Sequence, residues 1–248
     1  MVEPADRQPS PLATDDPLAV AVTGAIRSGD VPALVALLDT HLWLATARLG
    51  DPSAGVSRTL LHVATDWPGH FPRVGETIRA LVAAGADPTA RCAGQHTETP
   101  LHWAASSDDL EALDALLDCG ADVDADGAVI AGGTPLTDAT AFGQWEAARR
   151  LLTRGATAGL WEAACLGLLD RLRSLTRTEP APTSDEITGC FWGACHGGQL
   201  ATARHLLTLG ADPTWIGWDD LTPAQAARRS EAADVVRWLE AEVLPRHP

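Results

Sequence analysis

The sequence predicts an all-α solenoid of helix-turn-helix units, with hairpin fingers between the units. The clearest unit covers residues 99–122, where apolar residues recur at helical spacing in two short segments. Thr99 and Pro100 suit the start of the first helix, and Gly120 suits the end of the second. Two short amphipathic helices cannot bury their apolar faces alone, so the unit requires neighbouring copies of itself.

Copies of this unit follow one another along the chain. The unit opens with Thr-Pro-Leu-His-Trp-Ala-Ala and closes with Leu-Leu-Asp-Cys-Gly-Ala-Asp, and these motifs resemble the ankyrin repeat. The steps between opening positions are 40, 35, 24, 31 and 33 residues. The resemblance implies about seven units, of which the first and the one at Leu160 are degenerate. The opening positions are Leu61, Leu101, Leu136, Leu160, Phe191 and Ala224.

The same alignment orders the rest of the chain. Residues 1–16, rich in proline and acids, predict a disordered or loose leader, and residues 17–248 predict a single ankyrin-repeat domain. Residues 48–55 are expected to be a linker. Residues 66–73 carry an insertion in the second repeat, a stiff loop that either packs on its own repeat or contacts a ligand. After Gly155 the next helix follows almost at once, which explains the short 24-residue step.

The composition narrows the classes of function. A net charge of −15 disfavours nucleic acid and anionic membranes as partners. The chain has no lysine and no tyrosine, which excludes Schiff-base chemistry and phosphate loops. No apolar run is as long as a membrane span of about 20 residues, and the first residues do not resemble a signal peptide, so a cytoplasmic protein is expected. The five cysteines are scattered, which favours reduced, buried thiols, and we expect no metal and no other cofactor.

Two histidines occupy the histidine position of the repeat motif, His62 and His102. In ankyrin repeats this side chain usually ties a hairpin to neighbouring backbone, and the resemblance implies the same structural role here. Two consecutive repeats replace it with tryptophan, Trp161 and Trp192.

The next position is apolar in most ankyrin repeats, but Asp138 and Glu162 occupy it in consecutive repeats of this chain. Stacking of the repeats is expected to bring the two carboxylates together beside Trp103 and Trp161. Such a pair raises the pKa of one member and suits acid–base catalysis. Two interpretations stay open: a solvated inner face, or the groove site of a small-molecule-binding protein or enzyme with Asp138 and Glu162 as catalytic residues.

The leading hypothesis is a non-catalytic module that recognises a protein or peptide on an acidic, tryptophan-rich concave surface. Some of the nine tryptophans, such as Trp43 and Trp145, are expected in the core. Those on the concave side would anchor a neutral or basic partner. The resemblance implies contact through finger tips and inner-helix ends. The candidate contact residues are Trp67, His70, Phe71, His96, Trp103, Ser106, Phe142, Trp161, Trp192, His196, Trp215, Trp218 and Asp219.

Overall fold

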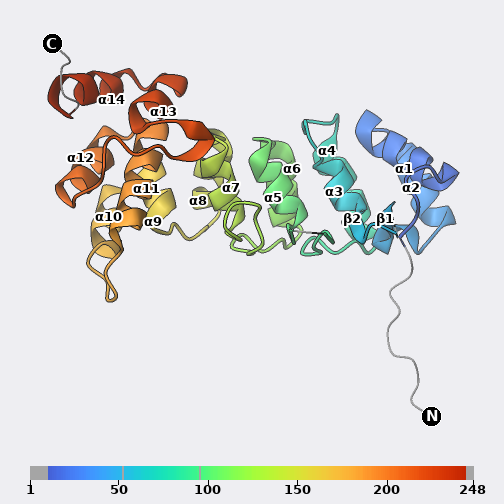
Figure 1. Ribbon diagram of the computed structural model, residues 1–248. Helices are drawn as coiled ribbons and strands as arrows, with labels where there is room; N and C mark the ends of the chain where they lie inside the picture. Colours follow the sequence, from blue (N-terminus) through green and yellow to red (C-terminus); the bar gives the residue numbers. More distant parts are fainter. Residues whose placement is uncertain (1–10, 52, 95, 244–248) are drawn as a thin grey trace. The chain divides into compact units, whose positions relative to one another are not determined.

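The computed structural model describes residues 11–51, 53–94 and 96–243. In this part of the chain, 14 α-helices form seven successive pairs, which confirms the predicted all-α fold (Figure 1). The chain divides into two compact units, which we describe separately. The N-terminal unit comprises the described residues up to Ala139 together with Gln144–Ala156, and the C-terminal unit comprises Thr140–Gly143 and the described residues from Thr157 onward.

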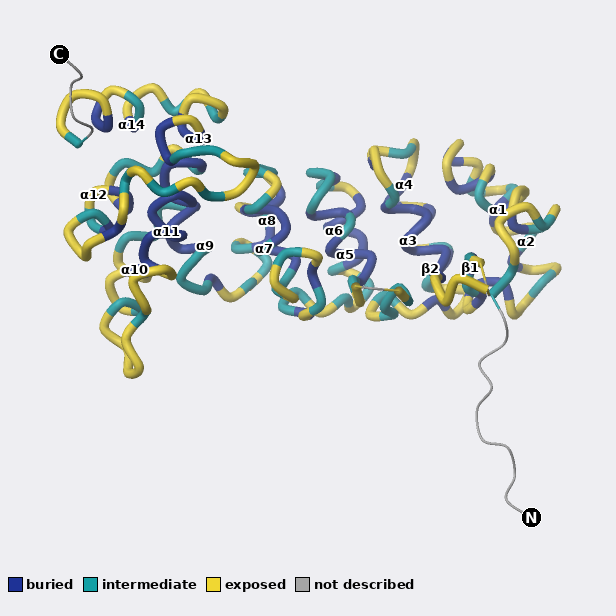
Figure 2. The backbone as a smooth tube through the Cα atoms, viewed as in Figure 1, coloured by how far each residue is buried: buried dark blue, intermediate teal, exposed yellow. Residues whose placement is uncertain are grey.

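The N-terminal unit contains helix pairs and one β-hairpin, and helix α7 crosses into the other unit. Exposed residues in both units concentrate on the turns, and buried residues concentrate on the helices (Figure 2). The elements are α1 (Pro17–Ser28), α2 (Val31–Thr40), η1 (Leu44–Thr46), β1 (Arg48–Asp51), β2 (Val56–Thr59), α3 (Leu60–Ala64), α4 (Val74–Ala83), α5 (Pro100–Ser106), α6 (Leu110–Asp118), α7 (Pro135–Ala141) and α8 (Trp145–Thr153).

The C-terminal unit is built around α11, which packs against α9, α12 and α13. Its core is continuous and includes the fully buried Phe191, Leu206 and Val235. The elements are α9 (Leu160–Cys165), α10 (Leu169–Leu175), α11 (Ser184–His196), α12 (Leu200–Thr208), η2 (Trp218–Asp220), α13 (Pro223–Arg229), α14 (Ala233–Trp238) and η3 (Leu239–Val243).

The motif histidines tie each helix start to the next finger, as expected. The Thr99 backbone N–H donates to Nδ1 of His102 at 3.1 Å. On the opposite side of the ring, Nε2 of His62 lies 3.0 Å from the carbonyl oxygen of Glu98, and Nε2 of His102 lies 3.4 Å from that of Gly133. Burial lowers the pKa of both histidines to about 4, so both rings are neutral at pH 7.

The prediction of a linker over residues 48–55 is wrong. Strand β1 lies in this segment and pairs with β2, directly after it, as an antiparallel hairpin. Leu49 is buried between the half-buried Arg48 and Gly50, so this strand has a covered face at Leu49. Leu12 extends this small sheet, since its backbone N–H donates to the carbonyl oxygen of Arg48 at 2.7 Å. Of the leader expected to be loose, residues 1–10 lie outside the described residues, and Leu12 is hydrogen-bonded to the hairpin.

Helix α11 begins well before the motif that defines its repeat. The motif opens at Phe191, but the helix starts at Ser184. Thr183 and Glu186 form a capping box in which the Thr183 N–H donates to Oε2 of Glu186 at 2.7 Å. This local start signal lies where other repeats have a finger, so Trp192 is placed in the middle of a helix.

Candidate functional site

Four tryptophans of the C-terminal unit pack together, and we call them the tryptophan cluster. They are Trp161 of α9, Trp192 of α11, and Trp215 and Trp218 of the finger that follows α12. Trp218 meets the other three edge-on, with ring centroids 4.8, 5.1 and 5.4 Å away. Trp161 and Trp192 stack with an interplanar angle of 19°. Each such contact adds about 1 kcal/mol beyond burial, so the cluster is held in one arrangement.

Hydrogen bonds fix the two inner rings of the cluster. Nε1–H of Trp192 donates to the carbonyl oxygen of Leu221 at 2.7 Å. Nε1–H of Trp161 donates to Oγ1 of Thr140 at 3.0 Å. The polar group of each indole is thus satisfied, which matters most for the buried Trp192.

Two glycines leave the space that these rings fill. A Cβ added to Gly193 would lie 2.7 Å from Cζ3 of Trp161, and one added to Gly217 would lie 2.8 Å from Cδ1 of Trp192. Both distances are far below van der Waals contact, so a side chain at either position would displace an indole.

The finger tip presents apolar and acidic groups to solvent. Trp218 is 44% exposed and Ile216 is 63% exposed. Asp219 and Asp220 are also exposed, with positive φ values of 57° and 56°, which aspartate tolerates better than most residues. The Asp219 carboxylate pairs with Arg229 at 2.5 Å, whereas Asp220 forms no ion pair with a described residue.

The remaining candidates of this unit differ in exposure. His196 is buried, with Nδ1 at 3.1 Å from Oγ of Ser230 and its ring 5.3 Å from that of Trp192. Burial lowers the pKa of His196 to about 4. His196 and the almost fully buried Trp192 therefore support the surface instead of contacting a partner, which corrects their expected role. Phe142 is 51% exposed and stays a candidate contact.

The insertion of the second repeat reaches across to the next repeat. The backbone N–H of His70 donates to Oδ2 of Asp109 at 2.6 Å, and Nε2 of His70 lies 3.0 Å from the carbonyl oxygen of Ser107. The loop therefore contacts the next repeat as well as its own, where Asp66 pairs with Arg58, and Asp109 is both the N-cap of α6 and the acceptor of this bond. Trp67 is 82% exposed, and Phe71 is half-buried.

The carboxyl group of Asp138 lies beside the carboxylate of Glu98. Its side chain is 0% exposed, and neither oxygen receives a hydrogen bond of good geometry from a described residue. Burial, together with the nearby charge of Glu98, raises the pKa of Asp138 to about 8. Glu98 also accepts a hydrogen bond at Oε2 from Nε1–H of Trp103, at 3.1 Å.

Glu162 serves its own helix. Its Oε2 accepts a hydrogen bond from the Gly159 backbone N–H at 2.9 Å, which completes a capping box at the start of α9. Asp138 and Glu162 fall in different units, so their juxtaposition stays a prediction.

Two further candidates lie at the fingers and helix ends of the N-terminal unit. The Ser106 hydroxyl donates to the carbonyl oxygen of Trp103 at 3.0 Å, and the Ser106 carbonyl oxygen accepts from Nε2 of Gln144 at 2.9 Å. Its polar groups are therefore used within the fold. His96 is exposed on a finger and stays available for contact.

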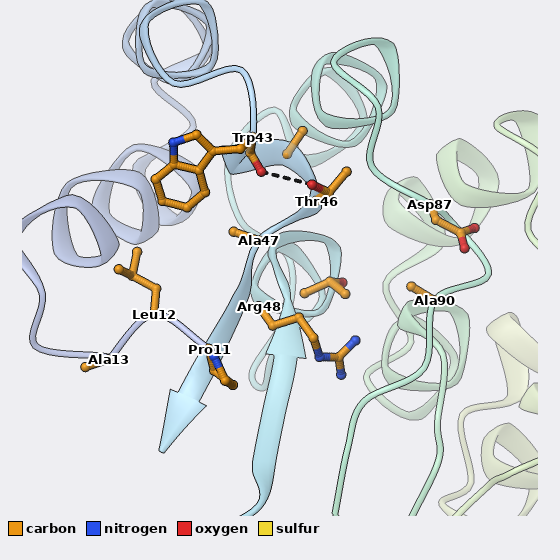
Figure 3. Close-up of a pocket in the computed structure, with 11 residues that line it drawn as sticks. Pro11, Leu12, Ala13, Trp43, Thr46, Ala47, Arg48, Asp87 and Ala90 are labelled. Carbon is orange, nitrogen blue, oxygen red and sulfur yellow. Dashed lines mark hydrogen bonds between the residues drawn. The ribbon is translucent and has the colours of Figure 1, made fainter. Parts of the chain in front are cut away.

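Cavities open on the N-terminal unit, and two of them involve the β-hairpin. One, of about 560 Å³, is lined by Leu12, Trp43 and Arg48 among others, and Trp43 lies beside the turn that the Thr46 hydroxyl closes (Figure 3). Trp43 is 53% exposed, so its expected place in the core is wrong. The other cavity, of about 900 Å³, is lined by the β-hairpin, by the following finger and by both Glu98 and Trp103.

The cysteines form no metal site in the part of the chain that the structure describes, where no three potential ligands come together. Cys165, Cys190 and Cys195 are buried in the C-terminal unit, whereas Cys92 and Cys119 are half-buried. Burial raises the pKa of Cys190 to about 12, so this thiol stays protonated at neutral pH.

The comparison with protein families identifies the repeats. Residues 61–159 match the family model of ankyrin repeats, in three copies. Residues 61–159 are therefore ankyrin repeats. The matched segment contains α3 to α8, and the helix pairs on either side continue the same pattern. Ankyrin repeats are generally protein–protein interaction modules.

Comparison with curated proteins finds no match to this sequence. Within the described ranges, no helix combines the length and the apolar character needed to cross a bilayer.

The sequence placed Trp161 and Trp192 at the same position of two consecutive repeats, but it did not indicate Glu98 as the neighbour of Asp138. Glu98, the neighbour of the buried Asp138, lies on a finger. The backbone conformation of a finger depends on glycine positions that the repeat motif does not specify. A glutamate placed just before a repeat start, within reach of a motif tryptophan, is the signal that could have found it.

Proposed function

We propose that this ankyrin-repeat protein binds a protein or peptide partner through the tryptophan cluster and the finger tip that carries Trp218. The observation that supports this most is an exposed indole held by three others. Trp218 contributes a large apolar surface and loses little conformational freedom on binding, because its neighbours already fix it.

The charge of the surface favours a basic or neutral partner. Asp220 lies beside Trp218 without an ion pair to a described residue, and the whole chain carries a net charge of −15. A field of that sign attracts basic segments and raises their association rate. Asp219 is partly neutralised by Arg229, so Asp220 is the acidic residue that would contact a positive side chain.

Loop Trp67–Phe71 and the exposed Phe142 are secondary contact candidates. Trp67 is the more exposed indole, but no aromatic neighbour holds it among the described residues. It would therefore lose more side-chain freedom than Trp218 when it is buried by a partner. The five cysteines are free thiols in the structure, and a reducing compartment such as the cytoplasm is the location that fits them.

The test is selection of binding peptides from a random display library, followed by affinity measurements on variants. Trp218→Ala is expected to weaken the selected peptides by about 30-fold, a loss of about 2 kcal/mol, and the selected peptides should be rich in apolar and basic residues. Leu209→Ala is the matched control, since Leu209 is 45% exposed in the same unit and should leave affinity unchanged.

Equal affinity in Trp218→Ala and the unmodified protein would contradict the proposal. Circular dichroism of both variants should match that of the unmodified protein, because neither side chain is buried. If Trp67→Ala alone reduces binding, the contact surface lies on the insertion of the second repeat instead.

A further inference from the structure

The N-terminal unit holds a half-buried carboxylate that forms no ion pair with any residue described in the structure. Glu98 accepts a hydrogen bond from Trp103, and both side chains line the cavity of about 900 Å³. None of the ion pairs among the described residues involves Glu98. A charge withdrawn from bulk water is costly without a partner, so a positive group on a ligand would be strongly favoured here.

A second carboxyl group faces the first. Asp138 is fully buried, with both oxygens lacking a hydrogen bond of good geometry from a described residue. The groups that face it are the Ile130 backbone and the Glu98 carboxylate. The fingers on either side approach closely, since a Cβ on Gly127 would lie 2.7 Å from the carbonyl oxygen of Thr97.

Trp103 adds an aromatic wall to this pair of carboxyl groups. Its ring meets His62 edge-on at 4.9 Å, and its N–H is held by Glu98, so its orientation is fixed. Indole is the best aromatic partner for a cation. His62 is neutral at pH 7 because burial lowers its pKa to about 4, so it does not repel a cation at Trp103.

The other titratable groups around the cavity do not supply the missing positive charge. They are Arg58, Asp51, His96 and Cys92. Arg58 is already paired with Asp66 at 2.8 Å. Hydrogen bonds from a serine lower the pKa of Asp51, and burial raises the pKa of Cys92, so the first is charged and the second is neutral at pH 7. His96 is exposed to water.

We propose that Glu98, Trp103 and Asp138 form a subsite for one organic cation, an ammonium or guanidinium group on a short alkyl chain. Glu98 accepts hydrogen bonds from the cation, and Trp103 offers its ring face. Asp138 releases its proton to solvent as the cation arrives, so one positive charge replaces another. A basic side chain of a partner and a free amine share this chemistry.

Proton release follows from the state of the empty site. The pKa of Asp138 is raised to about 8, so at pH 7 this carboxyl group keeps its proton. A cation beside Glu98 stabilises the ionised form of Asp138. Affinity for the cation should therefore rise as the pH increases from 6 to 8.

The test is a titration of the whole chain with N-acetyl-arginine amide, followed through the Trp103 indole N–H signal by NMR. Trp103→Phe identifies that signal. N-acetyl-citrulline amide is the matched control, because it has nearly the same shape without the charge. The arginine compound is expected to shift the signal to saturation, and the citrulline compound is expected to leave it in place. Tighter binding of 1,4-diaminobutane than of the arginine compound would identify a free amine as the source.

Two variants of the subsite and one control variant sharpen the result. Glu98→Gln keeps an acceptor for the Trp103 N–H but removes the charge, and it should weaken cation binding at least about tenfold. Calorimetry in two buffers of different ionisation enthalpy should detect about one proton released per cation at pH 7, and about none in Asp138→Asn. Trp218→Ala lies in the other unit and should change neither result, which separates this subsite from the proposed partner surface.

Equal responses to the charged and neutral compounds would overturn the proposal, and so would the absence of any response. Unchanged cation affinity in a folded Glu98→Gln protein would also overturn it. The comparison of two compounds uses the unmodified protein, so it decides the question even if a variant fails to fold.

Discussion

Asp138 and Glu162 hold the same position of the repeat motif, yet their environments differ. The Glu162 carboxylate accepts a hydrogen bond from the N–H of Gly159 and so caps its own helix. In α7 that task falls to Thr137, whose Oγ1 accepts from the Thr134 N–H at 3.1 Å, and Asp138 is left facing Glu98.

The cause is the start of each helix. Helix α7 begins three residues before Asp138, at Pro135, whereas α9 begins two residues before Glu162, at Leu160. The third residue of a helix can reach the N-cap N–H, and the fourth cannot. The Leu160 repeat lacks the Thr-Pro start, so its helix begins at the motif leucine and not one residue before it. The third helical residue, which caps the helix, is therefore Glu162. Position in a motif therefore does not determine environment unless the helix start is also known.

The largest effect is expected at Gly193, which holds this same motif position in the repeat that opens at Phe191. Gly193→Val places carbon atoms where Trp161 and Cys165 already lie, since even a Cβ would be 2.7 Å from Cζ3 and 2.8 Å from Sγ. We expect a loss of about 3 kcal/mol in the free energy of unfolding, measured in urea. Gly24→Ala is the control, because nothing lies within 4 Å of a Cβ there, and it should be neutral or stabilising. Equal losses in both variants would show that the indole packing is not responsible.

A smaller effect concerns the pH dependence caused by Asp138. Its folded-state pKa of about 8 lies above its unfolded value, so at this group the folded state binds more protons, and the contribution of Asp138 to stability falls as the pH rises toward 8. Between pH 6 and pH 8 this loss is roughly 2 kcal/mol. The buried His62, His102 and His196, whose pKa values are lowered to about 4, contribute in the opposite direction, so the test is a difference between proteins. From pH 6 to pH 8, urea unfolding of Asp138→Asn should gain roughly 2 kcal/mol relative to the unmodified protein, whereas Glu162→Gln, which keeps Asp138, should follow the unmodified protein. Parallel slopes in Asp138→Asn and the unmodified protein would contradict the assignment.

The smallest effect is expected for the cap at the start of α9. Glu162→Ala removes the acceptor for the Gly159 N–H and should cost about 1 kcal/mol of unfolding free energy. Glu162→Gln keeps an acceptor oxygen and should cost less than half as much. A larger loss in the Gln variant than in the Ala variant would mean that the negative charge, and not the cap, matters at this position.

The helical repeats were predictable from the sequence because their signals are local. Thr99, His102 and Gly120 mark the start, the tie and the end of a unit within 22 residues. The β1–β2 hairpin was not predictable in this way. Its strands are only four residues long, and they are stabilised by Leu12 and Ala93, which are distant in sequence.

The candidate site shows the same limit. The placement of Trp161 beside Trp192 follows from repeat periodicity, and the structure has the two rings stacked. The neighbours of Asp138 come from fingers of unequal length, and a finger can turn a carboxyl group away from solvent without any change in the motif. The burial of His196 likewise depends on Ser230 and Trp192, from two other positions of the unit.

The distribution of the thiols gives the chain a built-in reporter of local opening. Cys165 and Cys195 are 0% exposed in the C-terminal unit, whereas Cys92 and Cys119 in the N-terminal unit are half-buried. An alkylating reagent needs both access to sulfur and a thiolate, and burial denies both to the inner cysteines. Their rate of modification, read by mass spectrometry on the unmodified protein, therefore measures how often the C-terminal unit opens, independently of the rest of the chain.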